Sequence, residues 1–500
     1  MAEKITRIAI VGGGTAGWMT AATLSRYLHA DTLSIQLIES EEISMVGVGE
    51  ATVPIIQNFN RMLGINEWDF LRETKGTFKL GIAFKDWGKK GNLFFHGFGD
   101  FGADINGIAP HHHWLRMQVL GDHAPLAHSS FVTTAALANR FAPPSQAPEN
   151  LLSTYSYAYH FDASLYAAFL RRYSEERGAQ RIEGQIIKVN RSADSGFIEK
   201  LILKSGAEIN ADFYIDCSGL NALLIGESLG VPCEDWSAWL PCDTAIVAPC
   251  AMKGELTPYT LSTAKEAGWQ WHIPLQHRTG NGYVYASGFV SDVVAETSFN
   301  AALESPALSA PRWLKFKAGH RKNFWEKNCL AIGLAAGFME PLESTSIQLI
   351  QTGLARLISF FPDKNFDKRI ISEYNRTTRL EYERIRDFIV LHYCFSERDG
   401  ELWRYCRSMS LPDTLQHKID VFLSSGKIPM LAEESYAEYS WVSIFLGLGV
   451  QPERYDPLAE MIDSQKLIFA VSNFRKHIKH VVQSMPSHRE YVKKVCAMGS

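Results

Sequence analysis

The chain has 500 residues, of which 46% are hydrophobic and 21% charged, and its formal net charge is −4 at pH 7. This composition is typical of a globular protein with ample core and two or more structural units. It offers no basic excess for nucleic-acid phosphates, and no apolar stretch approaches the roughly 20 residues of a membrane-spanning helix. We therefore expect small-molecule partners, with neither nucleic acid nor a membrane among them.

The compartment follows from the N-terminus and the cysteines. The chain enters a predicted strand within a few residues, which leaves no room for a secretory signal peptide. Its eight cysteines are scattered without a C-x-x-C pair, which suits reduced thiols better than a disulfide framework or a zinc site. We expect a cytoplasmic protein.

The first 40 residues predict a nucleotide-binding start. Residues 5–11 read as a buried strand, 12–17 as a tight turn, 18–28 as a helix and 33–40 as a second strand. The turn has the spacing Gly12-x-Gly14-x-x-Gly17, which allows close approach of a pyrophosphate to the helix N-terminus. Glu39 closes the second strand, where a carboxylate can bind an adenosine ribose. The spacing alone does not distinguish FAD from NAD.

The middle of the chain alternates between short elements and loops. Residues 50–90 mix helical and extended signals, and 141–150 form a Pro-rich surface loop. A helix capped by Asp162 runs to about residue 177, where Gly178 ends it. The following strands are predicted at residues 186–192, 198–206 and 208–219.

Later segments return to the first sheet. Residues 211–219 and 328–338 look like strands of the nucleotide-binding sheet, so the cofactor and substrate regions interleave. A long helical pattern begins at residue 367. We expect an α/β protein in which residues 1–362 form a Rossmann-type module with an interleaved substrate region, and residues 363–500 form a helical unit that covers the substrate.

Five motifs, in this order along the chain, resemble those of the tryptophan halogenase family: GGGTAGW, VGVGEATVP, FKLG, GWQWHIP and EPLESTSI. The resemblance spans most of residues 5–455. It implies an FAD monooxygenase-like fold and an FADH2- and O2-dependent halogenase that makes hypohalous acid at the flavin and passes Cl or Br to an electron-rich aromatic. The implied flavin contacts are Gly12, Gly14, Thr15, Ala16, Gly17, Glu39, Gly49, Ala51 and Gly333.

The resemblance assigns the reacting groups to two motifs. Lys79 matches the catalytic lysine, which can hydrogen-bond hypohalous acid as an ammonium or form a haloamine as an amine. Glu343 matches a glutamate that stabilises the arenium cation and removes its proton, although a carboxylate there could equally stabilise the following helix. The amides of Thr345 and Ser346 match the halide site. Since tryptophan-specific members usually have glycine in place of Ser346, the choice between chloride and bromide stays open.

Aromatic residues set the expectations about the substrate. Trp269 and Trp271 would share one side of a strand that Pro274 ends, either as gatekeepers that keep the arene from the flavin or as a buried aromatic strand. The other residues that the resemblance assigns to substrate binding are His96, Phe98, Ser344 and Trp441.

The segment before residue 449 lacks the polar groups that grip free tryptophan in the family, so we expect a neutral arene such as an indole. Neighbouring histidines at positions 111–113 cannot easily share one ion, and no metal is expected.

The reductant and the rival functions complete the expectations. No second nicotinamide fingerprint is visible, and Gly333-Leu334 replaces the Gly-Asp of aromatic hydroxylases. We therefore expect a separate flavin reductase to supply FADH2. A flavin-dependent aromatic hydroxylase and a non-catalytic flavin-binding protein remain alternatives. The sequence leaves open the natural substrate, its ring position, its attachment to a carrier, and the oligomeric state, a homodimer included.

Overall fold

The computed structural model describes residues 3–28, 33–42, 50–148 and 150–497. Its contacts divide the chain into two interleaved compact units. The first unit comprises Met1–Gly76, Phe161–Asp243 and Lys315–Glu383, and the second comprises Thr77–His160, Thr244–Leu314 and Arg384–Ser500. Among the described residues, no helix is both long and apolar enough to cross a membrane.

The first unit is built on a sheet with the strand order β20-β21-β12-β1-β2-β8. All neighbouring strands are parallel except β20 and β21. The central strand is a buried run of aliphatic residues, which is typical of a parallel sheet covered on both faces. The strands are β1 (Arg7–Val11), β2 (Ser34–Glu39), β8 (Gln180–Glu183), β12 (Phe213–Asp216), β20 (Trp325–Glu326) and β21 (Cys329–Ala331).

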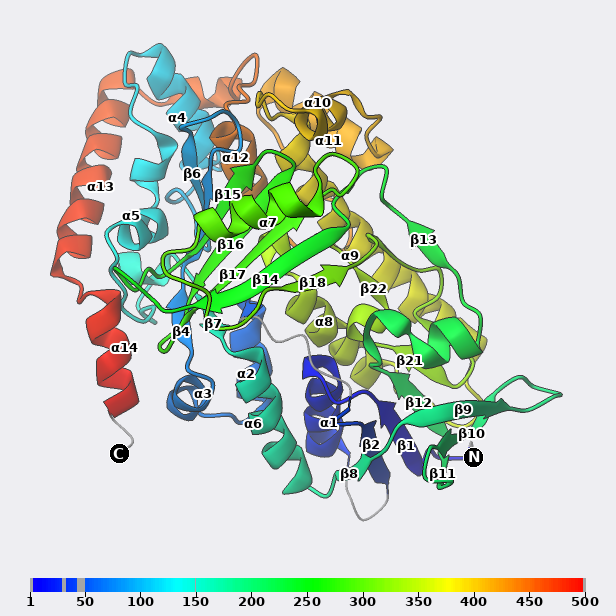
Figure 1. Ribbon diagram of the computed structural model, residues 1–500. Coiled ribbons are helices and arrows are strands. Elements are labelled where there is room, and N and C mark those ends of the chain that lie inside the picture. Colours follow the sequence, from blue (N-terminus) through cyan, green and yellow to red (C-terminus); the bar gives the residue numbers. More distant parts are fainter. Residues whose placement is uncertain (1–2, 29–32, 43–49, 149, 498–500) are drawn as a thin grey trace. The chain divides into compact units, whose positions relative to one another are not determined.

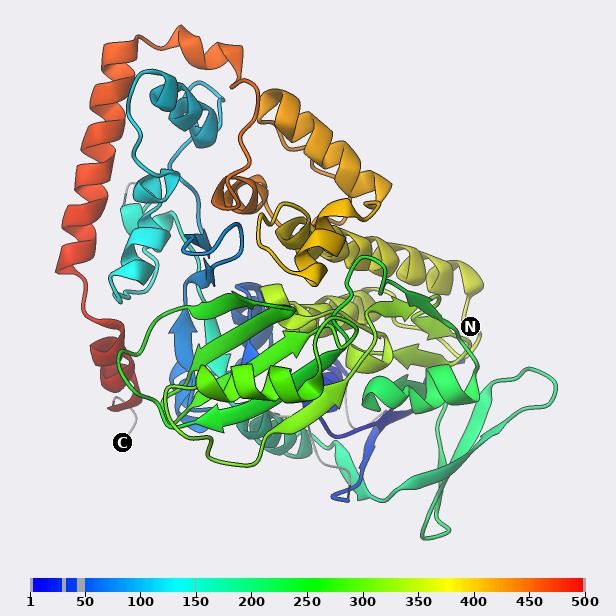
Figure 2. The same cartoon turned by 45° about the horizontal axis from the view of Figure 1, so that its top comes forward.

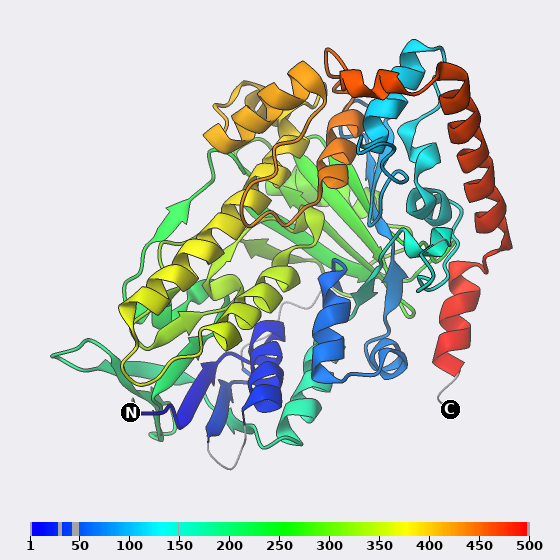
Figure 3. The same ribbon diagram turned by 180° about the vertical axis from the view of Figure 1, so that it is seen from behind.

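Helix α1 is the centre of the helical layer of this unit (Figure 3). It contacts α2, α6 and α8. Asp162 caps α6 by accepting hydrogen bonds from the amides of Ser164 and Leu165 at 3.0 and 3.3 Å. The helices are α1 (Thr15–Tyr27), α2 (Ile55–Leu63), α3 (Glu67–Glu73), α6 (Ala163–Glu175) and α8 (Ser346–Ser359), followed by α9 (Lys368–Cys394), whose residues after Glu383 belong to the second unit.

Two small antiparallel sheets of three strands extend the first unit, and one of them contains the long hairpin near its N-terminus (Figure 1). They are β9 (Ile186–Arg191), β10 (Ile198–Leu203) and β11 (Glu208–Asn210), and β13 (Cys233–Asp235), β19 (Gly319–Arg321) and β22 (Gly337–Phe338). The short strand β3 (Glu50–Ala51) lies apart from both groups in the sequence.

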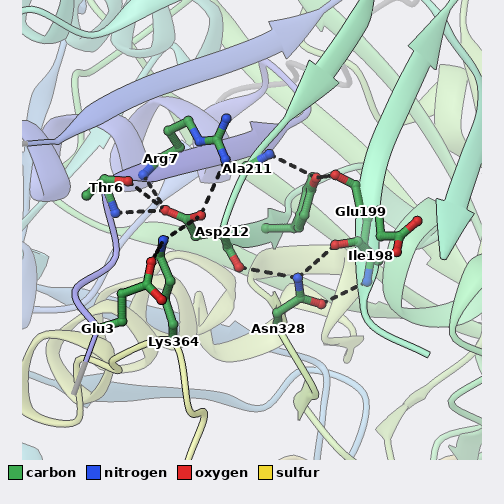
Figure 4. Close-up of polar contacts among 10 residues, drawn as sticks. Glu3, Thr6, Arg7, Ile198, Glu199, Ala211, Asp212, Asn328 and Lys364 are labelled. Atoms are coloured by element: carbon green, nitrogen blue, oxygen red, sulfur yellow. Dashed lines mark hydrogen bonds and ion pairs between the residues drawn. The ribbon is translucent and has the colours of Figure 1, made fainter. Parts of the chain in front are cut away.

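Asp212 ties the N-terminus to this framework (Figure 4). Its carboxylate accepts hydrogen bonds from the amides of Thr6 and Arg7 at 2.9 and 3.0 Å, and Lys364 forms an ion pair with it at 3.5 Å. Burial alone would raise the pKa of Asp212, but these hydrogen bonds and the lysine hold that pKa below its usual value. The start of β1 is thereby fixed beside β12.

The second unit is built on a sheet with the order β18-β14-β17-β16-β15-β5-β6. Helix α7 (Asp292–Ala301) lies across it (Figure 2). Phe299 of this helix packs in a buried cluster with Tyr283 and Tyr285. The strands are β5 (Gly81–Lys85), β6 (Leu93–Gly97), β14 (Thr244–Cys250), β15 (Thr260–Lys265), β16 (Gly268–Pro274), β17 (Thr279–Tyr285) and β18 (Arg312–Lys315).

Helices make up most of the rest of the second unit. Strand β4 (Thr77–Lys79) pairs antiparallel with β7 (Ala158–Phe161) and contacts the last helix, α14. The helices are α4 (Pro110–Val119), α5 (Phe131–Leu137), α10 (Glu401–Ser408), α11 (Asp413–Ser425), α12 (Glu438–Gly447), α13 (Ser464–Ser484) and α14 (His488–Ala497).

The predicted elements of the first 40 residues and the returning strands are confirmed, since β12 and β21 extend the sheet of β1. The first helix begins three residues earlier than expected, at Thr15 rather than Trp18, because Gly14 already serves as its N-cap. All eight cysteines are free thiols. The expected boundary at residue 362 stays a prediction, and the contacts group residues 363–383 with the first unit.

Candidate active site

The glycine loop of the first unit is shaped by close backbone contacts. Gly12 has φ +111°, and a Cβ there would lie 2.2 Å from the carbonyl oxygen of Cys217. A Cβ on Gly17 would lie 1.8 Å from the carbonyl oxygen of Gly12. Both positions therefore require glycine, whereas a Cβ on Gly14, at the N-cap of α1, would meet nothing within 4 Å.

Glu39 faces this loop from the end of β2. Its Oε2 occupies the place that a Cβ on Gly13 would take, only 1.4 Å from the ideal position. Arg181 on β8 donates from Nε to the other carboxylate oxygen. Glu39 is thus oriented on both sides, by the glycine loop and by a guanidinium.

The loops after β12 and β21 complete the same edge of the sheet. Asp216 accepts hydrogen bonds from the amides of Leu224 and Ile225, both at 2.8 Å, and so fixes the chain after β12. Gly333 has φ +70°, and a Cβ there would lie 2.7 Å from the Cβ of Ala16 in α1. This brings the loop that begins at Gly333 against the first turn of α1.

This edge fits an FAD. Ligands of open parallel sheets bind at the carboxyl ends of the strands, and the unpaired amides at a helix N-terminus favour phosphate. The open side of Gly14 leaves room for a pyrophosphate at the start of α1. Ala51 lies buried in β3. Gly49 lies outside the described residues.

The EPLESTSI motif forms a turn before α8. Glu343 is fully buried and ends the 3-10 turn Pro341–Glu343, so it precedes α8 rather than lying in its first turn. Ser344 has φ +62°, an uncommon conformation for a residue with a side chain, which often marks functional sites. Thr345 is the N-cap of α8 and Ser346 is its first residue, so their amides belong to a helix N-terminus that suits an anion.

Lys79 ends β4 in the second unit and is fully buried. Its ammonium lies 5.3 Å from the centroid of the Phe98 ring, within the range of a cation–π contact. Ala158 lies directly opposite it on β7. The nearby Lys85 and Lys89 are exposed, as expected for ordinary solvated lysines.

A chain of aromatic rings continues from Phe98. The ring centroids of His96 and Phe98 are 6.4 Å apart, and His96 lies 5.5 Å from Phe388. Phe388 stacks on Tyr436 at 3.7 Å and meets Trp441 edge-on at 4.9 Å. We call these five residues the aromatic cluster. The structure therefore unites three predicted substrate residues of the second unit.

A buried ion pair adjoins Trp441. The ammonium of Lys418 lies 4.2 Å from the centroid of the Trp441 ring and 2.7 Å from a carboxylate oxygen of Glu434. Burial lowers the pKa of Lys418, while the hydrogen bond and charge of Glu434 oppose that effect. The two charges neutralise each other within the protein.

Trp269 and Trp271 lie on the central strand β16 with ring centroids 5.9 Å apart, consistent with one shared face. Trp271 is seated over Gly282 of β17, where a Cβ would lie 2.1 Å from its ring. Pro274 ends the strand as predicted.

The histidine run lies on α4, where two of its three rings hydrogen-bond to backbone groups. His111 donates from Nε2 to the carbonyl oxygen of Gly426 at 2.8 Å, and His112 accepts from the amide of Asp456 at 3.2 Å. Burial, followed by the charge of His111, lowers the pKa of His112 to about 4. Within the described ranges, no group of three or more His, Cys, Asp or Glu residues could hold a metal.

Comparisons with known proteins give the family. Residues 7–464 match the tryptophan halogenase family, and the chain belongs to it. The chain is 42% identical to BrvH, a flavin-dependent halogenase from Brevundimonas sp. BAL3, with a TM-score of 0.95 over 98% of this chain and 99% of that one. Xcc4156, a flavin-dependent halogenase from Xanthomonas campestris, is 42% identical with a TM-score of 0.95 over 99% of both chains.

A curated relative, the tryptophan 6-halogenase SttH of Streptomyces toxytricini, is 32% identical over 97% of each chain. The chain is therefore an oxidoreductase of the flavin-dependent halogenase type with an FAD-binding, Rossmann-type fold, and the family uses FAD and halide. The expected fold class and reaction class are confirmed.

Sequence reasoning missed several residues of these sites. Gly13 could have been found, because it stands inside the glycine loop. Tyr436, which stacks on Phe388, was not singled out from the sequence. Phe388 and the pair Lys418–Glu434 lie on segments far from the motifs, and no local pattern distinguishes them from core residues.

Proposed function

We propose that this chain halogenates a neutral, electron-rich aromatic such as an indole, using FADH2 from a separate reductase. One observation supports the proposal above all. The buried ammonium of Lys79 lies against Phe98, the first ring of the aromatic cluster. A buried cation and a series of aromatic rings thus occur together in the second unit, which supports the roles proposed for them in halogen transfer and arene stacking.

The first unit would hold the cofactor and the halide. FAD, when bound in its reduced form, supplies hypohalous acid from O2 and halide. The amides at the start of α1 bind its pyrophosphate, and Glu39 accepts hydrogen bonds from the ribose. The amides of Thr345 and Ser346 bind chloride or bromide at the start of α8.

Lys79 and Glu343 divide the chemistry between them. The Lys79 ammonium hydrogen-bonds the oxygen of hypohalous acid, which makes the halogen more electrophilic, and protonates that oxygen so that it leaves as water when the halogen transfers to the arene. The Glu343 carboxylate stabilises the positive charge of the arenium cation and accepts its proton. Ser344 supports this turn by hydrogen bonding, and Trp269 and Trp271 keep the arene away from the flavin.

The charged pair beside the aromatic cluster favours a neutral substrate. Lys418 and Glu434 form an ion pair at 2.7 Å, and to grip an amino-acid zwitterion they would first have to separate in a buried place. Aromatic rings stack on an indole without needing either charge. Free indole is therefore proposed to react faster than free tryptophan.

One assay tests the whole proposal. The purified chain is supplied with FAD, NADH, a flavin reductase, oxygen, and equal chloride and bromide, and indole or tryptophan at the same low concentration. Halogenated products identified by mass support the halogenase, and the ratio of initial rates measures preference between the two free substrates. Hydroxylated product without halogen, or no product, would refute the reaction, while a clear preference for tryptophan would refute the substrate.

A further inference from the structure

Strand β4, which carries Lys79, is only three residues long. It pairs with β7 in the register Thr77–His160, Phe78–Tyr159 and Lys79–Ala158. A strand this short has few ladder hydrogen bonds to fix it. The position of the Lys79 side chain therefore depends on the other contacts that hold Thr77 and Phe78.

A buried histidine holds the first residue of β4. The hydroxyl of Thr77 donates to the carbonyl oxygen of Pro274 at 2.8 Å, which uses its single proton. His160 Nδ1, at 3.2 Å from the same hydroxyl oxygen, must therefore be the donor. Its Nε2 then accepts a hydrogen bond from the hydroxyl of Thr260 at 2.9 Å. This network links β4 to β15 and to the end of the strand of Trp269 and Trp271.

A second buried histidine holds the next residue. His488, the first residue of α14, has its Nδ1 2.8 Å from the carbonyl oxygen of Leu256, and a carbonyl can only accept. His488 Nε2 is therefore the acceptor for the amide of Phe78, at 3.1 Å. His488 thus accepts from the backbone of β4, as a carbonyl oxygen of a neighbouring strand would.

We propose that His160 and His488 are positioning residues, a histidine clamp that fixes β4 through Thr77 and the amide of Phe78 and so sets the place of the Lys79 ammonium. The proposal rests on the function proposed above for Lys79. It extends the site to the C-terminal helix α14, which no motif in the sequence connects with the reaction.

The charge state of the clamp agrees with this role. Burial, and then the charge of Lys79, holds the pKa of His160 well below its usual range. Burial lowers the pKa of His488 to about 4. Both rings are neutral near pH 7, so each can accept the hydrogen bond that its tautomer requires, and neither adds a positive charge beside Lys79.

Crossed substitutions test the clamp in the full chain with FAD, reductase and indole. Asparagine places an amide near the position of histidine Nδ1, and glutamine places one near Nε2. His160 contacts β4 through Nδ1 and His488 through Nε2. If the clamp exists, the two positions should prefer different replacements. Asn should preserve halogenation better than Gln at position 160, and Gln should preserve it better than Asn at position 488.

The quantity to measure is halogenated product formed per FADH2 consumed. His160→Asn and His488→Gln should stay within about threefold of the parent, while His160→Gln and His488→Asn should fall by about tenfold or more, because small displacements of a reacting group are costly. Thr77→Val should fall like His160→Gln, and Thr77→Ser should not. All variants should bind FAD with parental affinity, measured by flavin fluorescence, because the proposed FAD contacts lie in the first unit.

A matched control and two outcomes decide the matter. His111→Asn alters a buried histidine on α4 that bonds to Gly426, so it should lower the melting temperature and leave the yield per FADH2 unchanged. The same order of Asn and Gln at both clamp positions, or parental yield in all variants, would overturn the clamp alone. Undiminished halogenation by Lys79→Ala would overturn the role of Lys79 and the clamp with it.

Discussion

His488 should make the stability of the protein depend on pH in a way that one substitution removes. Burial lowers its pKa to about 4 in the folded protein, against the ordinary histidine value of 6.5. Between these values the unfolded chain binds more protons than the folded one, so stability falls as pH falls. Above pH 6.5 the ring is neutral in both states and contributes no pH dependence, and below pH 4 the loss is complete.

The magnitude follows from the shift. The full difference between 6.5 and about 4 corresponds to about 3 kcal/mol, and proton linkage gives about 2 kcal/mol of loss between pH 7.5 and pH 5. Glutamine at position 488 cannot titrate. The stability advantage of the parent over His488→Gln should therefore shrink by about 2 kcal/mol between these two pH values.

Urea unfolding of both proteins, followed by tryptophan fluorescence at constant ionic strength, measures this difference. The other buried histidines, such as His112, are present in both proteins, so their titration cancels in the comparison. A stability difference that stays constant from pH 7.5 to 5 would show that His488 is not held neutral by burial, and the tautomer assigned to it would be wrong.

Three further results are expected. Lys79→Ala should eliminate halogenated product while FAD still binds and reoxidises, and Lys85→Ala, at an exposed lysine, should behave like the parent, as product analysis by mass will check. Glu343→Gln should lower turnover by about 100-fold or more with FAD bound, because it removes charge and basicity together, and a loss of only a few-fold would leave Glu343 a structural role. The purified chain should not oxidise NADH catalytically until a reductase is added, and rapid stoichiometric NADH consumption without one would contradict the two-component arrangement.

The flavin edge of the first unit could be predicted because its determinants are local. The glycine spacing, the buried strand and the acidic end of β2 all lie within residues 7–39, where periodicity and turn chemistry act directly. The sequence alone could not predict how Glu39 is positioned against the glycine loop. That Glu39 lies over Gly13, and that Arg181 orients it from β8, depends on strands that are adjacent only in the folded sheet.

The part of the second unit to which we assign halogen transfer could be predicted only as single residues. Lys79 and Trp271 lie within recognisable motifs. The residues that hold them in place lie outside any motif. His160 lies 83 residues from Thr77 and 100 from Thr260, and His488 lies 410 residues from Phe78. Contacts between residues so far apart in the chain leave no periodic pattern in the sequence. The sequence also does not distinguish a histidine that only fills the core from one that fixes a strand.

The residues to which we assign a role fall into two sets, one in each unit, and each set has its own kind of chemistry. The proposed contacts to phosphate, ribose and halide, and the buried carboxylate of Glu343, belong to the first unit, whereas Lys79, Trp271 and the aromatic cluster belong to the second. A substitution in the second unit should therefore change product yield and substrate choice before it changes FAD affinity. A substitution at Gly17, where a Cβ would lie 1.8 Å from a backbone oxygen of the glycine loop, should do the reverse. Flavin affinity and product per FADH2, measured on the same variants, thus report on different parts of the chain, and the Lys79 strand is the part to which the second measurement should respond most.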